Sequence, residues 1–288
     1  MTLPFPEPLI RFAAFAAVFA VMALFELVSP RLARPEMAGS WKGRRWFTNL
    51  SMVVLSTVLL RLVFPAAAVG MALWAEANGW GLFRQAGIPP VVAGILAFVI
   101  LDFAVWLEHV ASHKIPLLWR IHRMHHADTG FDLTTALRFH PLEILLSMLW
   151  KAAIVILLGP PAVSVLVFEI VLNATAMFNH ANARLPDRLD RILRLVLVTP
   201  DMHRVHHSSW QPETDSNYGF NLPVWDRLFR TYRDQPKAGH DAMTIGLDDF
   251  RGPVTASLPW TLALPFRVAG YRVNDGADAA GQKKPTGK

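Results

Sequence analysis

The sequence contains no cysteine among its 288 residues. Without thiols the chain forms no disulfide bridges and offers no thiolate ligands, so disulfide-stabilised scaffolds and cysteine-rich zinc sites are both excluded. Any metal ion held by this chain would have to be bound by nitrogen or oxygen ligands, of which imidazole and carboxylate are the usual ones.

Charged residues are also scarce. Asp, Glu, Lys and Arg make up 17% of the chain, whereas 53% of its residues are hydrophobic. This apolar excess is typical of membrane proteins. The formal net charge of +6 would suit a nucleic-acid partner, but the basic residues flank hydrophobic runs and follow no nucleic-acid-binding motif. We interpret them as topology signals and as contacts to anionic lipid headgroups.

A convincing signal peptide is lacking as well. The first apolar run, residues 9–28, is longer than the hydrophobic region of a signal peptide, and Arg11 is the only basic residue near its start. We therefore expect a retained first transmembrane helix. Crossing about 30 Å of hydrocarbon takes roughly 20 helical residues. The further candidate runs are 47–75, 91–107, 142–158 and 162–179.

Prolines and glycines interrupt these runs at two places. Pro65 predicts a kink within the second run, and Gly159-Pro160-Pro161 predicts a turn between the last two. Those last two runs are short for a full span, so they are expected to form a tight hairpin. The sequence leaves open whether this hairpin crosses the whole membrane.

The basic residues predict an orientation. Segment 30–46 contains one acid, Glu36, against five basic residues, whereas segment 76–90 contains only Arg84; the five are Arg31, Arg34, Lys42, Arg44 and Arg45. Because cytoplasmic loops are enriched in Lys and Arg, we expect segment 30–46 to be cytoplasmic and the N-terminus to lie outside. By alternation, 108–141 and the chain after residue 180 are cytoplasmic, and every histidine lies in or next to those segments.

Histidine is abundant and clustered. His109 and His113 continue the run 91–107 four residues apart, so both imidazoles project from one helical face. The strings HRMHH at 122–126 and HRVHH at 203–207 repeat the positions i, i+3 and i+4, again expected on one face. Eight of the eleven histidines thus have ligand spacing: His109, His113, His122, His125, His126, His203, His206 and His207.

This pattern favours metal binding over packing. A lone histidine on a helix is usually structural or solvated, but three sets on one predicted membrane face are hard to explain in that way. One ion accepts at most about six ligands, and the eight imidazoles exceed that number even before His180 and His140 are added. We therefore expect a dinuclear centre, for which ligand chemistry leaves zinc and iron both open. His240 stands alone in a polar segment and is not expected to be a ligand.

The predicted fold is all-α: a polytopic membrane protein of about four to five membrane helices or hairpins, with a cytoplasmic histidine-rich helical cap that holds the dinuclear site. We expect N-terminal transmembrane helices with a basic loop at 1–90 and a catalytic domain at 91–235. An interfacial segment follows at 236–273, where Pro259 and Pro265 interrupt the apolar pattern, and a disordered tail at 274–288.

Acidic residues adjoin the histidine clusters. Asp128 follows His126, and Asp201 precedes His203 by two residues. Carboxylates often accept the second N–H group of a metal-bound imidazole, so both acids are candidates for that role, although helix capping or solvation would explain them equally. No catalytic residue beyond the metal ligands is predicted. Asp102 and Glu108 lie in or at the end of a membrane run and are expected to face a cavity or a partner.

These motifs resemble the fatty acid hydroxylase / sterol desaturase superfamily of integral-membrane di-iron oxygenases. The family pattern is HxxxH, HxxHH, a further histidine and a second HxxHH, and the chain matches it with the three sets above and with His180 in FNHANARLP. Supporting matches are TALRFHPLE at 135–143, ETDSNYG at 213–219 and WDRLFRTY at 225–232. The resemblance covers residues 102–232, and among family members the pattern is similar to bacterial sterol-desaturase-like proteins.

The chain departs from the family near His180. Related hydroxylases often carry a second histidine four residues later, where this chain has Arg184. Either His140 fills the gap or one metal keeps an open position. The residues that match the other motifs are expected to brace the metal-bearing helices from outside; they are Asn217, Tyr218, Trp225, Asp226, Arg227 and Tyr232.

The resemblance implies an O₂-dependent oxidoreductase of the bacterial inner membrane. A di-iron centre, with zinc as a possible substitute, would hydroxylate or desaturate a C–H bond of a lipid such as a sterol, a fatty acyl chain or an ether lipid. The chain lacks a dinucleotide-binding glycine motif and the HPGG of a fused cytochrome b5 domain, so electrons are expected from an external ferredoxin or cytochrome-type donor. A positive docking surface for it would comprise Lys114, Arg120, Arg123, Arg204 and Arg227, unless these contact lipid phosphates.

Two other functions stay open on the sequence. A zinc-dependent lipid hydrolase would use similar ligands but needs a carboxylate placed against a metal-activated water. A non-catalytic haem or metal protein for electron transfer needs only two axial histidines for its haem, which leaves the triple clusters unexplained. Metal content, O₂-dependent turnover and a haem absorption band distinguish the three.

Overall fold

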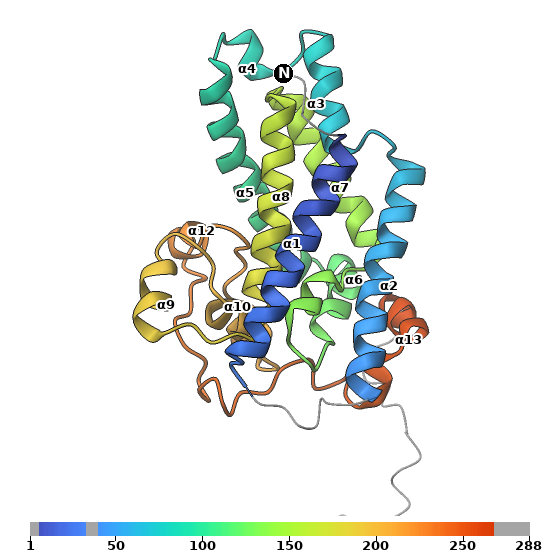
Figure 1. Ribbon diagram of the computed structural model, residues 1–288, viewed down its shortest axis with the longest axis vertical. Helices are drawn as coiled ribbons and strands as arrows, with labels where there is room; N and C mark the ends of the chain where they lie inside the picture. The colour runs from blue at the N-terminus through green and yellow to red at the C-terminus, as the bar shows by residue number, and fades with distance from the viewer. Residues whose placement is uncertain (1–5, 33–39, 268–288) are drawn as a thin grey trace, which may run out of the picture.

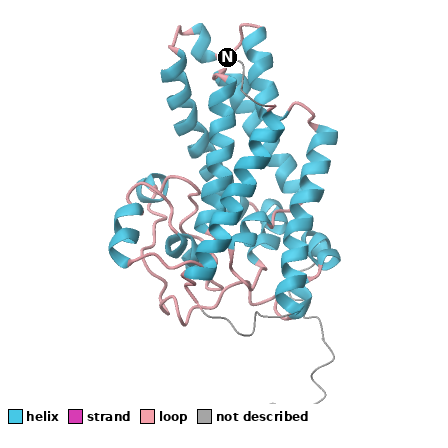
Figure 2. Ribbon diagram, in the orientation of Figure 1, coloured by secondary structure: helices cyan, strands magenta, loops and turns pink. Residues whose placement is uncertain are grey.

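The computed structural model describes residues 6–32 and 40–267, and this part of the chain is all-α (Figure 2). Its helices are α1 (Glu7–Val28), α2 (Ser40–Val63), α3 (Ala67–Ala77), α4 (Leu82–Gln85), α5 (Pro90–Lys114), α6 (Pro116–His126), η2 (Leu133–Leu137), α7 (Pro141–Leu158), α8 (Ala162–Asn179), α9 (Asp187–Leu193), α10 (Pro200–His206), α11 (Gln211–Thr214), α12 (Val224–Leu228), η3 (Pro253–Ala256), α13 (Leu258–Ala263) and η4 (Leu264–Phe266). Within the described ranges, β-structure is limited to isolated bridges.

The long helices form an upright bundle; most of the short ones gather at its lower end, whereas α4 lies at the upper end (Figure 1). Five segments are long and apolar enough to cross a membrane: Glu7–Val28, Ser40–Gln85, Pro90–Lys114, Pro141–Leu158 and Ala162–Asn179. They coincide with the five predicted apolar runs, which confirms the all-α polytopic class. The exposed surface of the bundle carries large aliphatic side chains, such as Leu24, Val54 and Ile95, that suit a lipid environment.

The second apolar run differs from the prediction. It begins earlier, at Ser40, so the predicted loop 30–46 ends in helix, and it divides into α2 and α3 around Pro65. A proline lacks the N–H that continues a helix and disfavours helical geometry in the residue before it. The break at Phe64–Ala66 is therefore sharper than a kink, and Ala67 follows it with a φ of 48°.

Two local features bring the histidine-bearing segments together. Helix α5 continues the third apolar run through His109 and His113 to Lys114, as predicted, and Pro116 then begins α6 after a one-residue break. Because a residue before proline avoids helical geometry, α6 turns back against α5. The turn predicted at Gly159-Pro160-Pro161 joins α7 to α8, but both helices pack on α3 and α5 and not tightly on each other, so the expected tight hairpin is not formed. Gly159 caps α7 with a φ of 64°. A Cβ on Gly159 would lie 2.5 Å from the carbonyl oxygen of Trp80, so glycine is required there.

The C-terminal segment packs back on the bundle through η3, α13 and η4. Trp260 and Leu264 are buried against Met52 of α2 and Met124 of α6. The segment is broken into short helices at its prolines, as expected, whereas its position at a membrane interface stays a prediction. The predicted tail 274–288, residues 268–272 and Arg34 and Glu36 of the basic loop lie outside the described residues.

A buried ion cluster ties α2 to the segment after α6. The guanidinium of Arg45 is fully buried and lies 2.6 Å from Asp128 and 2.5 Å from Asp132. Burial alone would raise the pKa of Asp128, but the charges of Arg45 and Arg138 outweigh it and lower that pKa to about 2. Asp128 therefore stays ionised, and its charge holds the base of the bundle together.

The Arg45→Met variant should lose much of its stability. Removing one partner of a buried pair leaves uncompensated charge and typically costs about 3–5 kcal/mol. Helical circular dichroism in detergent during denaturation measures the loss, and the exposed neighbour Arg44→Met is the matched control. A second signature is pH: Asp128 stabilises the fold above its unfolded pKa of about 4, and this contribution disappears as the pH falls through about 2. Equal stability of both variants would contradict the prediction.

Candidate metal centre

Nine of the predicted histidines converge at the loop-rich end of the bundle in two groups. His109, His113, His122, His126 and His206 form one group, and His125, His180, His203 and His207 form the other. Within each group the candidate ligand atoms lie within 4.8 Å of one another. The predicted ligand sets of α5, α6 and α10 are thus brought together, and His180 joins them from the end of α8.

The two groups adjoin each other. The ring of His126 in the five-histidine group stacks on that of His207 in the four-histidine group with centroids 4.6 Å apart. His125 and His122, which belong to different groups, have ring centroids 5.4 Å apart. The nine imidazoles therefore make one continuous buried site with two centres.

Each HxxHH motif is divided between the groups. In α6, His122 and His126 belong to the five-histidine group and His125 to the other; in the second motif, His203 and His207 belong to the four-histidine group and His206 to the first. A helix turns by about 100° per residue, so positions i and i+4 differ by only about 40° whereas i+3 and i+4 differ by about 100°. The three histidines of each motif therefore do not all point to one site, as the sequence suggested, but are divided between two neighbouring centres.

Within each group, imidazole nitrogens face one another at close range. The Nε2 atom of His122 lies 3.1 Å from Nε2 of His109 and 3.2 Å from Nε2 of His126. In the other group, Nε2 of His180 lies 3.1–3.2 Å from Nε2 of His125, His203 and His207. Ligands at right angles around a metal with bonds of about 2.1 Å are about 3 Å apart. The spacing therefore fits imidazoles around a common ion.

Hydrogen bonds on the opposite ring nitrogen fix the tautomer of several imidazoles. Nδ1 of His109 donates to the carbonyl oxygen of Tyr218, Nδ1 of His206 to that of Ser216, and Nδ1 of His180 to that of Ala176, each at 2.7 Å. Because a carbonyl oxygen only accepts, each Nδ1 must carry the proton, and the Nε2 lone pair faces the group. This is the state in which a neutral histidine ligates a metal.

Burial favours the uncharged form of six of these rings. All nine side chains are removed from solvent, and burial, assisted by the neighbouring imidazoles, holds the pKa of His125, His126, His203 and His207 well below the usual range. It lowers the pKa of His180 to about 4 and that of His206 to about 3. At neutral pH these rings therefore offer lone pairs without first having to release a proton.

The carboxylates that contact the cluster are not those predicted from the sequence. Asp128 pairs with Arg45, and Asp201 pairs with Arg31 at 3.0 Å, so arginines engage both acids. Instead, Glu143 lies 2.6 Å from Nδ1 of His122. Asp215 lies 3.4 Å from Nδ1 of His113. Glu143 stands in the TALRFHPLE string at 135–143, which sequence reasoning treated only as supporting evidence for the family.

The remaining two histidines, His140, a predicted ligand, and His240, which was not expected to be one, lie outside both groups. His140 caps α7, with Nδ1 accepting from the backbone N–H of Leu142 and Nε2 3.3 Å from the carbonyl oxygen of Leu262. His140 therefore does not replace the histidine that related hydroxylases carry where this chain has Arg184, and the second group has four histidines. The side chain of Arg184 itself is exposed. His240 is buried 3.8 Å from Asp201 and belongs to neither group.

The loop 215–232 braces the cluster, as the motif residues suggested. The carboxylate of Asp226 accepts hydrogen bonds from Trp106, from Thr231 and from the backbone N–H groups of Tyr218 and Gly219. This holds the carbonyl oxygen of Tyr218 against His109. Trp225 donates to Asp102 at 2.8 Å, which gives that intramembrane acid its partner.

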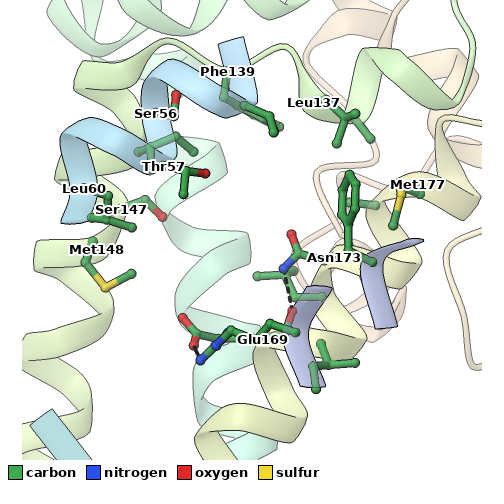
Figure 3. A pocket seen from close by; sticks show the side chains of 18 of the residues that line it. Ser56, Thr57, Leu60, Leu137, Phe139, Ser147, Met148, Glu169, Asn173 and Met177 are labelled. Atoms are coloured by element: carbon green, nitrogen blue, oxygen red, sulfur yellow. Dashed lines mark hydrogen bonds and ion pairs between the residues drawn. The ribbon is translucent and has the colours of Figure 1, made fainter. Parts of the chain in front are cut away.

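A largely apolar cavity of about 840 Å³ reaches the cluster from within the bundle. Its walls come from α1, α2, α5, α7 and α8, and His109 and His122 lie at one of its ends. Figure 3 shows this lining, with Phe139 and Leu137 in the upper part of the view, Met177 at the right and Glu169 below them. A lipid chain would fit such a space by shape and polarity.

Comparison with known proteins agrees with this geometry. The family model described as fatty acid hydroxylase matches residues 94–231. An ornithine lipid hydroxylase of Rhizobium tropici is 31% identical over 62% of this chain and 51% of its own length. An alkylglycerol monooxygenase of Xenopus tropicalis is 28% identical over 74% of this chain and 46% of its own length. The chain thus spans about half the length of these relatives.

A cholesterol 25-hydroxylase-like protein of Danio rerio is 30% identical over 52% of this chain and 59% of its own length. No solved structure matches the chain. The family match, the relatives and the five candidate membrane helices lead to one conclusion: the chain is an integral membrane protein whose residues 94–231 match the fatty acid hydroxylase family.

Proposed function

We propose that the protein is a membrane monooxygenase that hydroxylates a C–H bond of a lipid at a dinuclear iron centre. The observation that carries the proposal is the convergence of nine imidazoles in two adjoining groups that border an apolar cavity. The named activities of the relatives, an ornithine lipid hydroxylase and alkylglycerol monooxygenases, support hydroxylation over desaturation.

The reaction consumes one O₂, two electrons and two protons, and it yields an alcohol and water from a C–H bond. Side chains alone do not activate O₂, so a bound pair of iron ions would supply the redox chemistry. The cavity wall holds the lipid chain and keeps water away from the site. Glu143 and the carbonyl oxygens of Tyr218, Ser216 and Ala176 keep the imidazole rings in their ligating orientation.

A zinc-dependent lipid hydrolase is supported less well. Hydrolysis needs a carboxylate that is free to accept a proton beside the metal. Of the acids near the cluster, Glu143 is hydrogen-bonded to His122 and Asp215 lies against both His113 and Lys114. Nine histidines also exceed what a single zinc ion binds.

We further propose that the histidine end faces the cytoplasm, with the N-terminus outside, and that an external protein delivers the electrons there. Of the residues predicted for its docking surface, Lys114, Arg120 and Arg227 are exposed. Arg123 and Arg204 are buried and so are not available to a partner. Arg204 instead donates to Asn182 and lies over the ring of Phe131. A docking surface would therefore have to rely on the three exposed residues.

The purified protein should contain about two iron ions per chain, as a two-metal site requires. The double variant His203→Ala/His207→Ala removes half of the four-histidine group and should keep about one iron ion, with loss of turnover. His240→Ala, a buried histidine outside both groups, is the control. Metal analysis and mass spectrometry of membrane lipids test this: the product should gain one oxygen atom under aerobic conditions only. Zinc as the sole metal, or an unchanged lipid profile, would refute the proposal.

Glu143→Gln should weaken metal binding by about 10- to 100-fold, the usual effect of losing the carboxylate that orients a histidine ligand. Asp201→Asn should change it far less, because Asp201 contacts Arg31 rather than a ligand. Competition against a chelator of known affinity measures both variants. A larger effect of Asp201→Asn would show that the acid predicted from sequence proximity, and not the one placed by the fold, supports the site.

A further inference from the structure

Charged residues lie at a second place on the wall of the apolar cavity. Arg11 of α1 lies 2.6 Å from one carboxylate oxygen of Glu169 on α8, and Lys151 of α7 lies 3.3 Å from the other. All three line the cavity. Glu7, which is not among the lining residues, pairs with Arg11 at 2.6 Å in the first turn of α1.

These charges lie well inside the bundle. Lys151 is ten residues after Pro141, and Glu169 is ten residues before Asn179, the helix ends nearest the histidines. At the rise of an α-helix, both are about 15 Å from the histidine end. Ionisable residues at such depth are costly and usually mark a pathway or a binding site. The charge cluster is therefore a candidate for function and not only for packing.

The carboxylate of Glu169 is the most buried group of the cluster. The side chain of Glu169 is 7% exposed, and two cations share this one carboxylate. Arg11 and Glu7 are similarly exposed, at 23% and 27%, and Glu108 and Glu143 also line the cavity, nearer the histidines. A ligand that reaches this part of the cavity thus meets two cations beside one buried carboxylate.

Donors remain free at this cluster. Arginine has five N–H donors and lysine three. Among the described residues, the hydrogen bonds of Arg11 use its Nε and one terminal nitrogen, and that of Lys151 uses a single acceptor. The remaining N–H donors of Arg11 and Lys151 are therefore available to the oxygen acceptors of a ligand in the cavity.

We propose that Arg11 and Lys151 form a subsite for the anionic oxygen group, a carboxylate or a phosphate, of the lipid that enters the cavity. The inference rests on the proposed function and adds the part of the substrate that it leaves open. With the anion held at this subsite, the chain runs toward His109 and His122. A gap of about 15 Å needs at least about twelve C–C bonds, because each bond of about 1.5 Å advances a zigzag chain by only about 1.25 Å. The distance between the subsite and the histidines would thus determine which carbon of the lipid chain reaches them.

Photolabelling tests the subsite without turnover. The probe is palmitic acid with a diazirine near its methyl end, added to the protein in nanodiscs of phosphatidylcholine. We expect it to label the histidine end of the cavity, at Leu137, Phe139 or Met177, as located by peptide mass spectrometry. Its methyl ester, which lacks the charge, should not label those residues selectively. Phosphatidylglycerol with the same diazirine on one acyl chain is the phosphate arm, and the arm that labels this end identifies the anion.

Variants separate binding from helix pairing. Arg11→Met and Lys151→Met should each raise the half-saturating probe concentration by at least about tenfold, the effect expected for loss of a charged hydrogen bond, and Arg11→Lys should restore much of it. Arg84→Met, which removes an exposed arginine paired with Glu76, is the control. Glu169→Gln keeps both cations but removes the carboxylate they share, so labelling should persist or tighten.

The proposal is overturned if acid and ester label alike, if neither anionic probe labels the histidine end, or if Glu169→Gln abolishes labelling as Arg11→Met does. The last result would mean that the cluster only stabilises the packing of α1 against α8 and does not bind an anion. Because labelling needs neither metal nor O₂, its failure leaves the proposed hydroxylation intact. Failure of the metal and lipid analyses would in turn leave the subsite intact.

Discussion

Converging imidazole lone pairs are the constraint around which this protein is organised. In each histidine group, Nε2 atoms approach to 3.1–3.2 Å while at least some of their opposite nitrogens are fixed as donors to carbonyl oxygens. Such lone pairs repel one another unless a cation lies between them. Neutral ligands leave the charge of bound ions largely uncompensated, and Glu143 and Asp215, at the edge of the five-histidine group, are placed to offset part of it.

The scaffold keeps these rings in place by contacts that are themselves buried and polar. Arg45 joins α2 to Asp128 and Asp132, and the loop around Asp226 positions the carbonyl oxygen that orients His109. Arg138 is fully buried as well and donates to the carbonyl oxygen of Met124, within the HRMHH motif of α6. Preorganisation of this kind matters because a ligand ring that is free to rotate would have to be ordered by the metal itself.

The apolar cavity explains why such a site belongs in a membrane protein. Its walls come largely from the candidate membrane helices and are mostly apolar, and they include His109 and His122. The charges of Arg11, Lys151 and Glu169 are exceptions on that wall, and their ion pairs tie α1, whose residues are otherwise not buried, to α7 and α8. A single helix thus contributes both to the wall of the cavity and to the proposed anion subsite.

Much of this architecture could be predicted from the sequence because it depends on local periodicity. The apolar runs gave the five candidate membrane helices, and the clustering of His109 to His207 gave nine residues that do converge. Residues far apart in the chain were harder to relate. Proximity in sequence suggested Asp128 and Asp201 as partners of the ligands, whereas the fold places Glu143 there, a residue 21 positions from His122.

The sequence by itself determined the kind of ligand, the helical setting of each motif and the membrane character of the chain, since these follow from residue type and spacing. Only the tertiary structure decided how each HxxHH triplet divides between the two groups, why His140 is left out, and which charges line the cavity with the histidines. The physical reason is that helical periodicity fixes the angles between side chains on one helix. It does not fix the rotation and height at which separate helices dock.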